Sequence, residues 1–461
     1  MANSFWTLLR VLLERRAQER SCAWNRVQLE SHQARNVAAL RTYALEHSPF
    51  YRDFHRGFAA APLQELPILT KARMMEHFDD LVTDRRLRLA DLEAFLRSNS
   101  GDERYLGRYV VLATSGSTGR RGVFVFDDSE WIRAVAAITR PIAWAKARTA
   151  HKPPRAALIA SAAPWHYSAR VGRALANRIA PALRLDAAAP IAELVAQLNT
   201  WQPQALATYP SVLRQLAAEQ AAGRLQIPLQ NVATSAEVLT ADVRAAVHRA
   251  WNIPVQDTYG ATEYAPIASE CAEGRKHLFE NGAVIEITDA HGKSVPPGES
   301  GERVLLTVFG RRIQPLIRYE ISDLVRVSGE TCACGRPYRV IESVDGREED
   351  ILHFEAVGGG ASVAVHPNRF HEALEGLAVE AWQVIQDASG LELRLVGPHT
   401  PVLCRAAEEA IRAMLVQTGA RAPRINVHFD SPLERGPTGK APLIIARKLV
   451  SRKNDGDQHV E

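Results

Sequence analysis

The residues best suited to chemistry in this chain gather in one glycine-rich stretch, Thr114–Gly122, which reads TSGSTGRRG. Its glycines allow the backbone to take positive φ angles and to approach a ligand closely. Two threonine and two serine hydroxyls, with the main-chain N–H groups between them, would face one small volume, a combination that suits a phosphate. Arg120 and Arg121 add positive charge at the rim. The stretch therefore predicts a phosphate-binding loop.

The apolar runs on either side position this loop. Tyr109–Ala113 and Val123–Phe126 predict the two buried strands of a hairpin. The Walker phosphate-loop motif occurs nowhere in the chain, so the loop would be of another kind. A flexible Ser/Gly-rich hairpin without a ligand is the alternative that the stretch alone leaves open.

A second polar stretch, Asp257–Tyr264, follows an apolar run that predicts a parallel strand. Ligands in open α/β sheets collect at the carboxyl ends of the strands. Gly260 permits a tight turn there, Thr262 offers a hydroxyl, and Glu263 offers a hard oxygen ligand suited to Mg²⁺. Taken alone, the stretch could also be a loop with an ordinary acidic residue.

Three further stretches are weaker signals when each is taken alone. Asp323, at the end of Arg318–Asp323, could accept hydrogen bonds from a ribose diol, but an aspartate at a strand end is usually a turn residue. Gly346–Asp350 is a polar junction. In Gly436–Lys440, two glycines and a proline hold a lysine on a loop, where a lysine is usually solvated.

Composition limits the function classes. The chain has 461 residues, of which 46% are hydrophobic and 23% charged, values typical of a soluble protein with two or more domains. Its formal net charge is +4, from 56 basic and 52 acidic residues without a long basic block, so nucleic-acid binding is not expected. Five cysteines are an odd number and form no disulfide framework, which favours a reducing cytoplasm.

No run of about 18 apolar residues occurs, so we expect no transmembrane segment. Arg10 interrupts the apolar stretch Phe5–Leu13, and no small-residue cleavage site follows it, which argues against a signal peptide. An amphipathic helix packed on the body of the protein is favoured, and a helix on a membrane surface is the alternative.

The order of predicted elements indicates an α/β fold with more than one part. Residues 1–47 look helical throughout, and strands then alternate with helices between 156 and 258, which implies a mostly parallel sheet covered on both faces. From about residue 278 the strands look antiparallel. We expect an N-terminal domain over 1–345, a hinge at 346–350, an α+β domain over 351–450 and a disordered tail over 451–461.

Together the five stretches, TSGSTG, YGATE, RYEISD, GREED and GPTGK, resemble the ordered motifs of adenylate-forming enzymes, which include acyl-CoA synthetases, adenylation domains and luciferases. The phenylacetate–CoA ligase-like branch looks closer still, through His47–Arg52, Leu66–Lys71, Gln314–Tyr319 and Cys332–Gly335. The likeness extends over about residues 40–445. It implies a large N-terminal adenylate-forming domain with mixed sheets and a small α+β C-terminal lid domain.

The resemblance also implies roles for individual residues. The phosphates of ATP would be cradled by Ser115, Gly116, Ser117, Thr118 and Gly119. The adenine pocket would be walled by Ser235, Ala236, Glu237, Tyr259 and Gly260, and the ribose hydroxyls would be bound by Asp323 and Arg347. Thr262 would contact the α-phosphate, Glu263 would hold Mg²⁺, and Lys440 would bridge the substrate carboxylate and the α-phosphate.

The sequence departs from the family pattern at two places. Arg121 and Gly122 replace the usual proline and the residue after it, which should change the stiffness of the loop while its glycines remain. Glu349 stands where the family usually has a hinge aspartate. By analogy of position, the acyl pocket would lie near Trp165, His166, Tyr167 and Tyr209, although each of these side chains could equally be structural.

Three cysteines and a histidine could form a structural zinc site. Cys271, His277, Cys332 and Cys334 are the ligand set of a closed tetrahedral site, and similar pairs occur in some members of this branch. The spacing of Cys332 and Cys334 is tighter than usual, so four separate reduced side chains are the alternative.

These features predict a cytoplasmic ligase that depends on ATP and Mg²⁺. It would make an acyl adenylate from a small aryl or related carboxylic acid and pass the acyl group to coenzyme A. A carrier-protein thiol or an amine is the alternative acceptor, and a catalytically silent nucleotide-binding protein is a second alternative. A homodimer is one expectation for the assembly, which the sequence does not determine.

Overall fold

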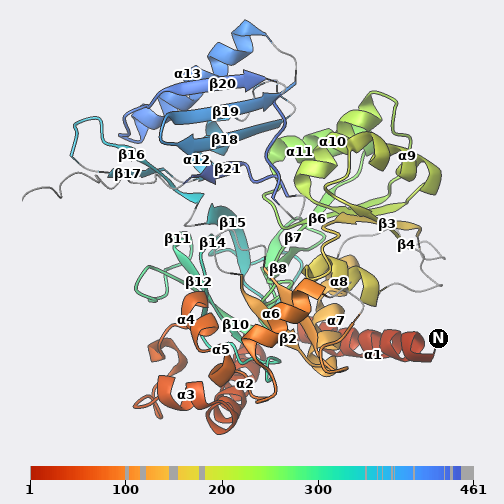
Figure 1. Ribbon diagram of the computed structural model, residues 1–461, viewed down its shortest axis with the longest axis vertical. Helices are drawn as coiled ribbons and strands as arrows, with labels where there is room; N and C mark the ends of the chain where they lie inside the picture. Colours follow the sequence, from red (N-terminus) through yellow and green to blue (C-terminus); the bar gives the residue numbers. More distant parts are fainter. Residues whose placement is uncertain are drawn as a thin grey trace, which may run out of the picture. The chain divides into compact units, whose positions relative to one another are not determined.

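The structure is a computed structural model that describes residues 2–98, 103–114, 121–144, 154–175, 182–347, 350–360, 362–365, 367–374, 377, 379, 381–397, 400–429, 431–436 and 440–447. The chain divides into two compact units. The larger unit comprises Met1–Glu348 together with Arg435–Ala441, and the smaller comprises Glu349–Glu434 and Pro442–Glu461. Figure 1 shows the elements of each unit.

The larger unit begins with a series of helices, of which α2, α3 and α4 have first turns capped by side chains. They are α1 (Ala2–Glu19), η1 (Arg20–Ala23), α2 (Arg26–His47), α3 (Pro49–Phe54), η2 (Leu63–Glu65), α4 (Lys71–Glu76), α5 (Phe78–Leu81) and α6 (Leu89–Ser98). Asn25 and Gln28 form a capping box at the start of α2, which divides the long helix predicted over 1–47. Thr70 caps α4 as its sequence predicts, because its hydroxyl accepts the N–H of Arg73 at 3.2 Å.

A sheet of ten strands forms the centre of the larger unit, in the order β11-β14-β15-β9-β8-β7-β6-β5-β3-β4. Its parallel half, from β4 to β7, is built by the strand–helix alternation that the sequence predicts. Its elements are β3 (Ala156–Ala160), α8 (Tyr167–Ala174), β4 (Ala182–Asp186), α9 (Ile191–Trp201), β5 (Ala205–Thr208), α10 (Pro210–Ala221), β6 (Asn231–Ser235), α11 (Ala241–Trp251) and β7 (Val255–Tyr259). Helices α9, α10 and α11 cover one face of these strands through a continuous apolar cluster (Figure 1).

The rest of the sheet is antiparallel; the pattern that begins near residue 278 predicts this for β11, β14 and β15, whereas β8 and β9 precede that point. It contains β8 (Ala268–Glu270), β9 (Lys276–Leu278), β11 (Ser300–Gly301), β14 (Asp323–Val327) and β15 (Val340–Arg347). Two smaller antiparallel sheets lie in the same unit. One is the hairpin of β1 (Val110–Ala113) and β2 (Val123–Phe126), which precedes α7 (Asp128–Trp144), and the other joins β10 (Ala283–Thr288), β12 (Arg303–Val308) and β13 (Tyr319–Ile321).

The smaller unit is α+β, in agreement with the expectation. Its elements are β16 (Leu352–Glu355), β17 (Ser362–Val365), α12 (Pro367–Leu374), β18 (Ala381–Asp387), β19 (Gly390–Val396), α13 (Pro401–Gln417), β20 (Ile425–Phe429) and β21 (Ile444–Ala446). Four strands form a mixed sheet in the order β20-β19-β18-β21, and β16 pairs with β17. Apolar side chains of α12, α13 and the four-stranded sheet form a core of their own.

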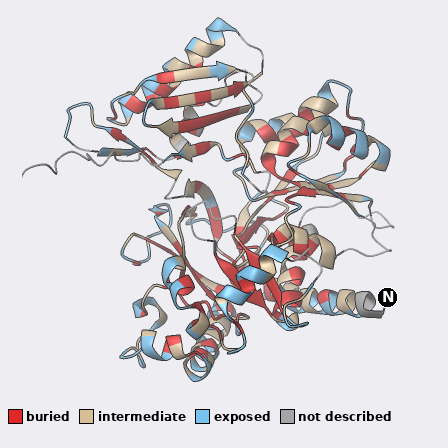
Figure 2. Ribbon diagram, viewed as in Figure 1, coloured by how far each residue is buried: buried red, intermediate tan, exposed pale blue. Residues whose placement is uncertain are grey.

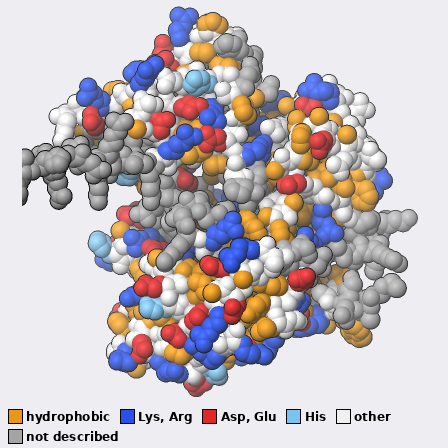
Figure 3. Space-filling model, viewed as in Figure 1, with side chains coloured by type: hydrophobic (Ala, Val, Ile, Leu, Met, Phe, Trp, Pro, Cys, Tyr) orange, Lys and Arg blue, Asp and Glu red, His pale blue; other side chains and the backbone are white. Residues whose placement is uncertain are grey.

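Burial follows the sheets. Figure 2 shows that buried residues concentrate in the strands and on the helix faces that pack against them. Acidic and basic side chains are interspersed on the face drawn in Figure 3, which is consistent with the nearly balanced charge. Among the helices that the structure describes, none combines the length and the apolar character needed to cross a bilayer.

Candidate functional site at the carboxyl ends of the parallel strands

The hairpin that should carry the phosphate loop is formed as predicted. Strands β1 and β2 pair from Val110↔Phe126 to Ala113↔Val123. At the base of the loop, Thr114 N–H donates to Gly122 O at 2.9 Å, and Gly122 N–H donates to Thr114 Oγ1 at 2.8 Å. The loop residues themselves, which include the predicted phosphate ligands Ser115, Gly116, Ser117, Thr118 and Gly119, lie outside the described residues.

Gly122 is packed closely against its neighbours. A Cβ atom at this position would come within 2.9 Å of the Phe124 ring and 3.3 Å of Lys71 Cε. A larger residue would therefore push against β2 and against the first residue of α4. The packing at this position therefore favours a residue without a side chain.

The strands β3, β5, β6 and β7 are neighbours in the sheet and run in the same direction. The polar residues that follow them therefore meet at one edge of the sheet. His166 lies beyond the end of β3, Tyr209 directly after β5, and Tyr259 at the end of β7. Ser235 ends β6, and Ala236, which has a φ of 72°, and Glu237 follow it. The structure thus brings together residues that the sequence placed in four separate stretches.

The turn after β7 holds Gly260, Thr262 and Glu263 in place. A Cβ atom on Gly260 would lie 3.3 Å from Ala265 Cβ, so the turn is closely packed. Glu263 is buried, and its Oε1 accepts the hydroxyl of Tyr319 at 3.1 Å. Burial, and after it the charge of Glu263, raises the pKa of Tyr319 well above its usual value, so the hydroxyl stays a donor.

Tyr319 was not predicted as a site residue, although it lies within the quoted motif Arg318–Asp323. Its position is fixed by Arg318, which has a φ of 48° and a buried side chain. The guanidinium donates to Leu66 O at 2.6 Å and to Gly292 O at 2.8 Å, and it pairs with Glu286 at 3.3 Å. Arg318 therefore anchors the start of β13 to two loops and to β10.

The two predicted ribose ligands are directly opposite each other. Asp323 and Arg347 are paired in the antiparallel ladder of β14 and β15. Asp323 is buried, and its Oδ2 accepts the hydroxyl of Tyr259 at 2.6 Å. This bond connects the end of β7 with β14. The side chain of Arg347 lies outside the described part, and so does Glu349, the predicted hinge residue.

Lys440 lies in the same unit as these residues, although they precede it by about 90 positions or more. Its Nζ is 5.8 Å from the centre of the Tyr209 ring. Burial, and after it the charge of Lys440, lowers the pKa of His166 to about 3, so the imidazole is neutral at physiological pH. The lysine ammonium is thus near the carboxyl ends of β3 and β5.

The four residues predicted for the acyl pocket have different surroundings. Trp165 is half-buried, and the Arg121 guanidinium lies 4.7 Å from the centre of its ring. The His166 ring bonds Ser168 Oγ through Nδ1 at 2.8 Å. Tyr167 packs edge-on against Trp131 in the apolar core, and the Tyr209 hydroxyl accepts the N–H of Ser161 at 3.0 Å. Trp165 is therefore the most accessible of the four, and the pocket role of all four stays a prediction.

The cysteine and histidine residues predicted to bind zinc converge. The ligand atoms of Cys271, His277, Cys332 and Cys334 all lie within 4.8 Å of one another. Cys271 Sγ is 3.7 Å from Cys332 Sγ, and Cys334 Sγ is 3.2 Å from His277 Nε2. His277 Nδ1 lies 3.1 Å from Tyr338 O, an arrangement that directs Nε2 towards the three sulfur atoms. The donor set and the mutual distances of its ligand atoms are those of a group that could hold one metal ion.

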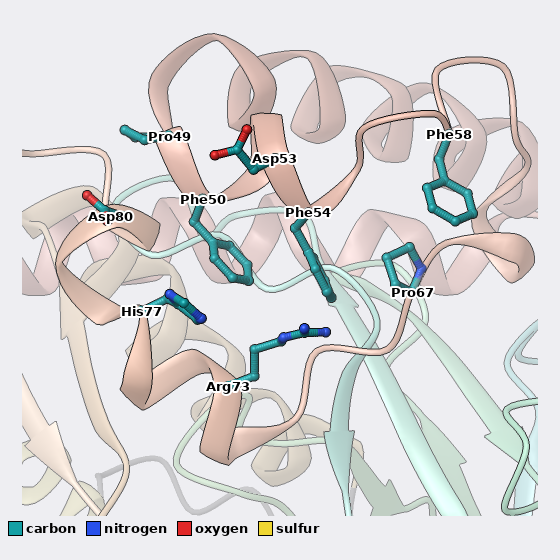
Figure 4. A pocket seen from close by; sticks show the side chains of 9 residues that line it. All are labelled: Pro49, Phe50, Asp53, Phe54, Phe58, Pro67, Arg73, His77 and Asp80. Atoms are coloured by element: carbon teal, nitrogen blue, oxygen red, sulfur yellow. The ribbon is translucent and has the colours of Figure 1, made fainter.

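A surface cavity lies elsewhere in the larger unit, between α3, α4 and α5 (Figure 4). Its volume is about 480 Å³. Phe50 and Phe54 stack along it with ring centres 4.8 Å apart, and Arg73 lies 4.9 Å from the Phe54 ring. None of the predicted site residues lines it, so this cavity is not part of the candidate site.

Comparison with known proteins places the fold in a class. Residues 108–307 match the family described as AMP-binding enzyme. The crystal structure of 2-hydroxyisobutyryl-CoA ligase, in the postadenylation state with R3-HIB-AMP, superimposes with a TM-score of 0.70 at 20% identity and covers 90% of both chains. The fold is therefore that of adenylate-forming CoA ligases.

Two curated proteins resemble parts of this chain in sequence. A phenylacetate–coenzyme A ligase of Thermus thermophilus is 24% identical over 276 residues, which are 55% of this chain and 60% of that protein. Protein CapK of Staphylococcus aureus is 27% identical over 167 residues, 36% of either chain. In both, the match thus spans less than two thirds of the relative's length. The resemblance to the phenylacetate–CoA ligase-like branch of the adenylate-forming enzymes is confirmed.

Proposed function

We propose that this protein is an AMP-forming acid–thiol ligase. It would activate a carboxylic acid with ATP to give an acyl adenylate and pyrophosphate, and then transfer the acyl group to a thiol. Coenzyme A is the proposed acceptor, because the matching ligases named above form CoA thioesters. A small aryl or related acid is the proposed substrate, since Trp165 presents a half-buried ring beside the strand ends.

One observation supports the proposal most strongly. Ala441, next to Lys440, bonds Glu237 across 204 positions of sequence, and Lys440 lies by Tyr209 at the carboxyl end of β5. A solvated loop lysine would have no reason to be held there. The position suits an ammonium group that acts where ligands of an open α/β sheet bind.

The chemistry follows from charge. A carboxylate oxygen attacks the α-phosphorus of ATP, a new C–O–P linkage forms, and the bond to the bridging oxygen breaks as pyrophosphate leaves. Lys440 would stabilise the negative charge on the reacting oxygens, and loss of such a preorganised group costs about 10²–10³-fold in rate. The thiolate then attacks the acyl carbonyl carbon and AMP leaves with the electron pair of the broken C–O bond.

Several residues would support these steps. Glu263, a buried hard-oxygen ligand oriented by Tyr319, would hold Mg²⁺, which when bound neutralises phosphate oxygens. Asp323 and Arg347 would bind the ribose, and the loop Ser115–Gly119 would bind the phosphates. Glu349 would serve as the hinge of a C-terminal lid that changes position between the two half-reactions. A zinc ion held by the cysteine and histidine cluster would be structural.

Carboxylate-dependent exchange of pyrophosphate into ATP tests the activity. Purified protein is assayed with a panel of aryl, fatty and amino acids. Exchange should appear with one class of acid and fall by about 10²–10³-fold in Lys440→Ala. Lys293→Ala, which alters an exposed turn lysine, is the matched control and should retain activity.

The acceptor is identified in a second assay, in which preformed acyl adenylate is offered coenzyme A, a carrier-protein thiol or an amine. Discharge by an amine but not by coenzyme A would replace the ligase assignment with the alternative. Nucleotide binding without exchange for any acid would favour a catalytically silent protein on this fold.

A further inference from the structure

The segment that carries Lys440 is held on the larger unit by several separate contacts. Arg435 donates through Nη2 to Gln215 Oε1 on α10 at 3.3 Å. Gly436 N–H donates to Lys440 O at 2.9 Å, which closes the segment into a short loop. Ala441 is 2% exposed, and its N–H donates to Glu237 Oε1 at 2.9 Å. Arg435 and Ala441 are therefore both bonded to side chains of the larger unit.

Glu237 connects this segment with helix α10. Besides the N–H of Ala441, its carboxylate accepts the N–H of Ser211 at 2.9 Å and the hydroxyl of Ser211 at 3.1 Å. Ser211 is in the first turn of α10, whose N-terminal N–H groups have no partner within the helix. A negative charge at this end of a helix is favourable.

Glu237 caps helix α10 from outside the usual N-cap position. Tyr209 is the N-cap residue of α10 and, within the described chain, its side chain makes no cap hydrogen bond. The usual cap is a short side chain at that position, whereas here a glutamate from after β6 replaces it. The longer side chain reaches both Ser211 and Ala441. Burial raises the pKa of Glu237, and the hydrogen bonds from Ser211 and Ala441 and the charge of Lys440 oppose that shift.

We infer that Glu237 is a positioning residue for Lys440, beyond any contact that it makes with adenine. Its carboxylate joins the N-terminus of α10 to the residue after the lysine, while the Tyr209 ring at the same helix end lies beneath the ammonium. Helix α10 with its N-cap residue and Glu237 together form a seat for three described residues of this segment, Arg435, Lys440 and Ala441. One part of this inference rests on the proposed function, namely that the seat aligns Lys440 for adenylation.

A double-mutant cycle tests that consequence. Glu237→Gln keeps the volume of the side chain and removes its charge. It should lower the exchange kcat by about 10–100-fold, the cost of a displaced catalytic group, with the larger effect in kcat rather than in KM for ATP. In the Lys440→Ala background the same substitution should have almost no further effect, because Glu237 acts through the lysine. The inference would be overturned if Glu237→Gln lowered the exchange kcat equally in both backgrounds, or if it did not lower kcat in a chain that keeps Lys440.

A second measurement does not depend on activity. Hydrogen exchange of the peptide that contains Ala441 should be faster in Glu237→Ala than in the wild type, because the main-chain N–H loses its acceptor, which the amide oxygen of a glutamine would still supply. Asn25→Ala removes the cap of α2 in the same unit and controls for a general loss of stability. Unchanged protection of Ala441 in Glu237→Ala would exclude the seat. Absence of exchange activity in the wild type would refute the proposed function alone, since the protection of Ala441 would still test the seat.

Discussion

Replacing Tyr319 with phenylalanine would remove a single hydroxyl beside the proposed magnesium ligand. The Tyr319 hydroxyl donates to Glu263 Oε1 at 3.1 Å, and both residues are buried. The phenyl ring would remain, so its edge contact with Phe124 and the pairing of β13 with β12 should be kept. The change therefore acts on the orientation of Glu263 more than on the fold.

The expected size follows from the kind of bond that is lost. A hydrogen bond to a charged group contributes about 1.5–3 kcal/mol, which corresponds to about 10–150-fold in an equilibrium constant. Removal of a group that orients a metal ligand typically weakens metal affinity by about 10–100-fold. This range overlaps the one obtained from the energy of the hydrogen bond. Tyr319→Phe should therefore raise the Mg²⁺ concentration needed for half-maximal pyrophosphate exchange by about 10–100-fold.

The assay is a Mg²⁺ titration of exchange at saturating ATP and acid. Tyr109→Phe is the matched control, because Tyr109 is also a buried tyrosine that donates to a carboxylate, that of Asp84, which is not a proposed metal ligand. The control should keep the wild-type Mg²⁺ dependence. If Tyr319→Phe also kept it, or if both variants shifted equally, Glu263 would not be the residue that binds the ion.

Three other substitutions test separate parts of the molecule. Cys332→Ser should lower the zinc content from about one ion per chain to nearly none and reduce the melting temperature, whereas Cys404→Ser should change neither, as measured by elemental analysis and calorimetry. Arg318→Met should destabilise the protein by about 3–5 kcal/mol in thermal or denaturant unfolding, because it leaves the Glu286 carboxylate buried without its partner, and Glu286→Leu in the same chain should recover most of the loss. Because burial lowers the pKa of His166 to about 3, its contribution to stability is complete above the unfolded pKa of 6.5 and is lost as the pH falls towards 3. His166→Gln should therefore move the midpoint of acid unfolding, followed by circular dichroism, to lower pH, and a shift to higher pH would contradict this reasoning.

The parallel half of the fold could be predicted because its signals are local. Short apolar runs such as Ala205–Thr208 alternate with helical spacing, and parallel strands joined by helices produce that pattern. Strand β4, Ala182–Asp186, was not predicted. It lies at the edge of the sheet with no buried residue, so its sequence ALRLD lacks an apolar run.

The sequence indicates which residues could form the site, but it does not show which of them are in contact. The sequence contains three cysteines and a histidine, but only the fold shows that residues 61 positions apart, Cys271 and Cys332, meet. The bond between Tyr319 and Glu263 spans 56 positions, and no local pattern marks that tyrosine as an orienting group. In the same way, Glu237 was recognised only as part of an adenine pocket. Its bond to Ala441 depends on the return of a distant segment.

Because the segment that carries Lys440 returns to the larger unit, its contacts there can be weak. The segment Arg435–Ala441 belongs to the larger unit, while the chain before and after it belongs to the smaller. The few hydrogen bonds and the ring contact described above would bind a free peptide of this length only weakly. Covalent attachment on both sides converts the association into an intramolecular one, for which effective concentrations are on the order of millimolar. Weak contacts are then sufficient for occupancy, and a longer connection, such as an insertion directly before Arg435 or directly after Ala441, should alter the occupancy of the seat.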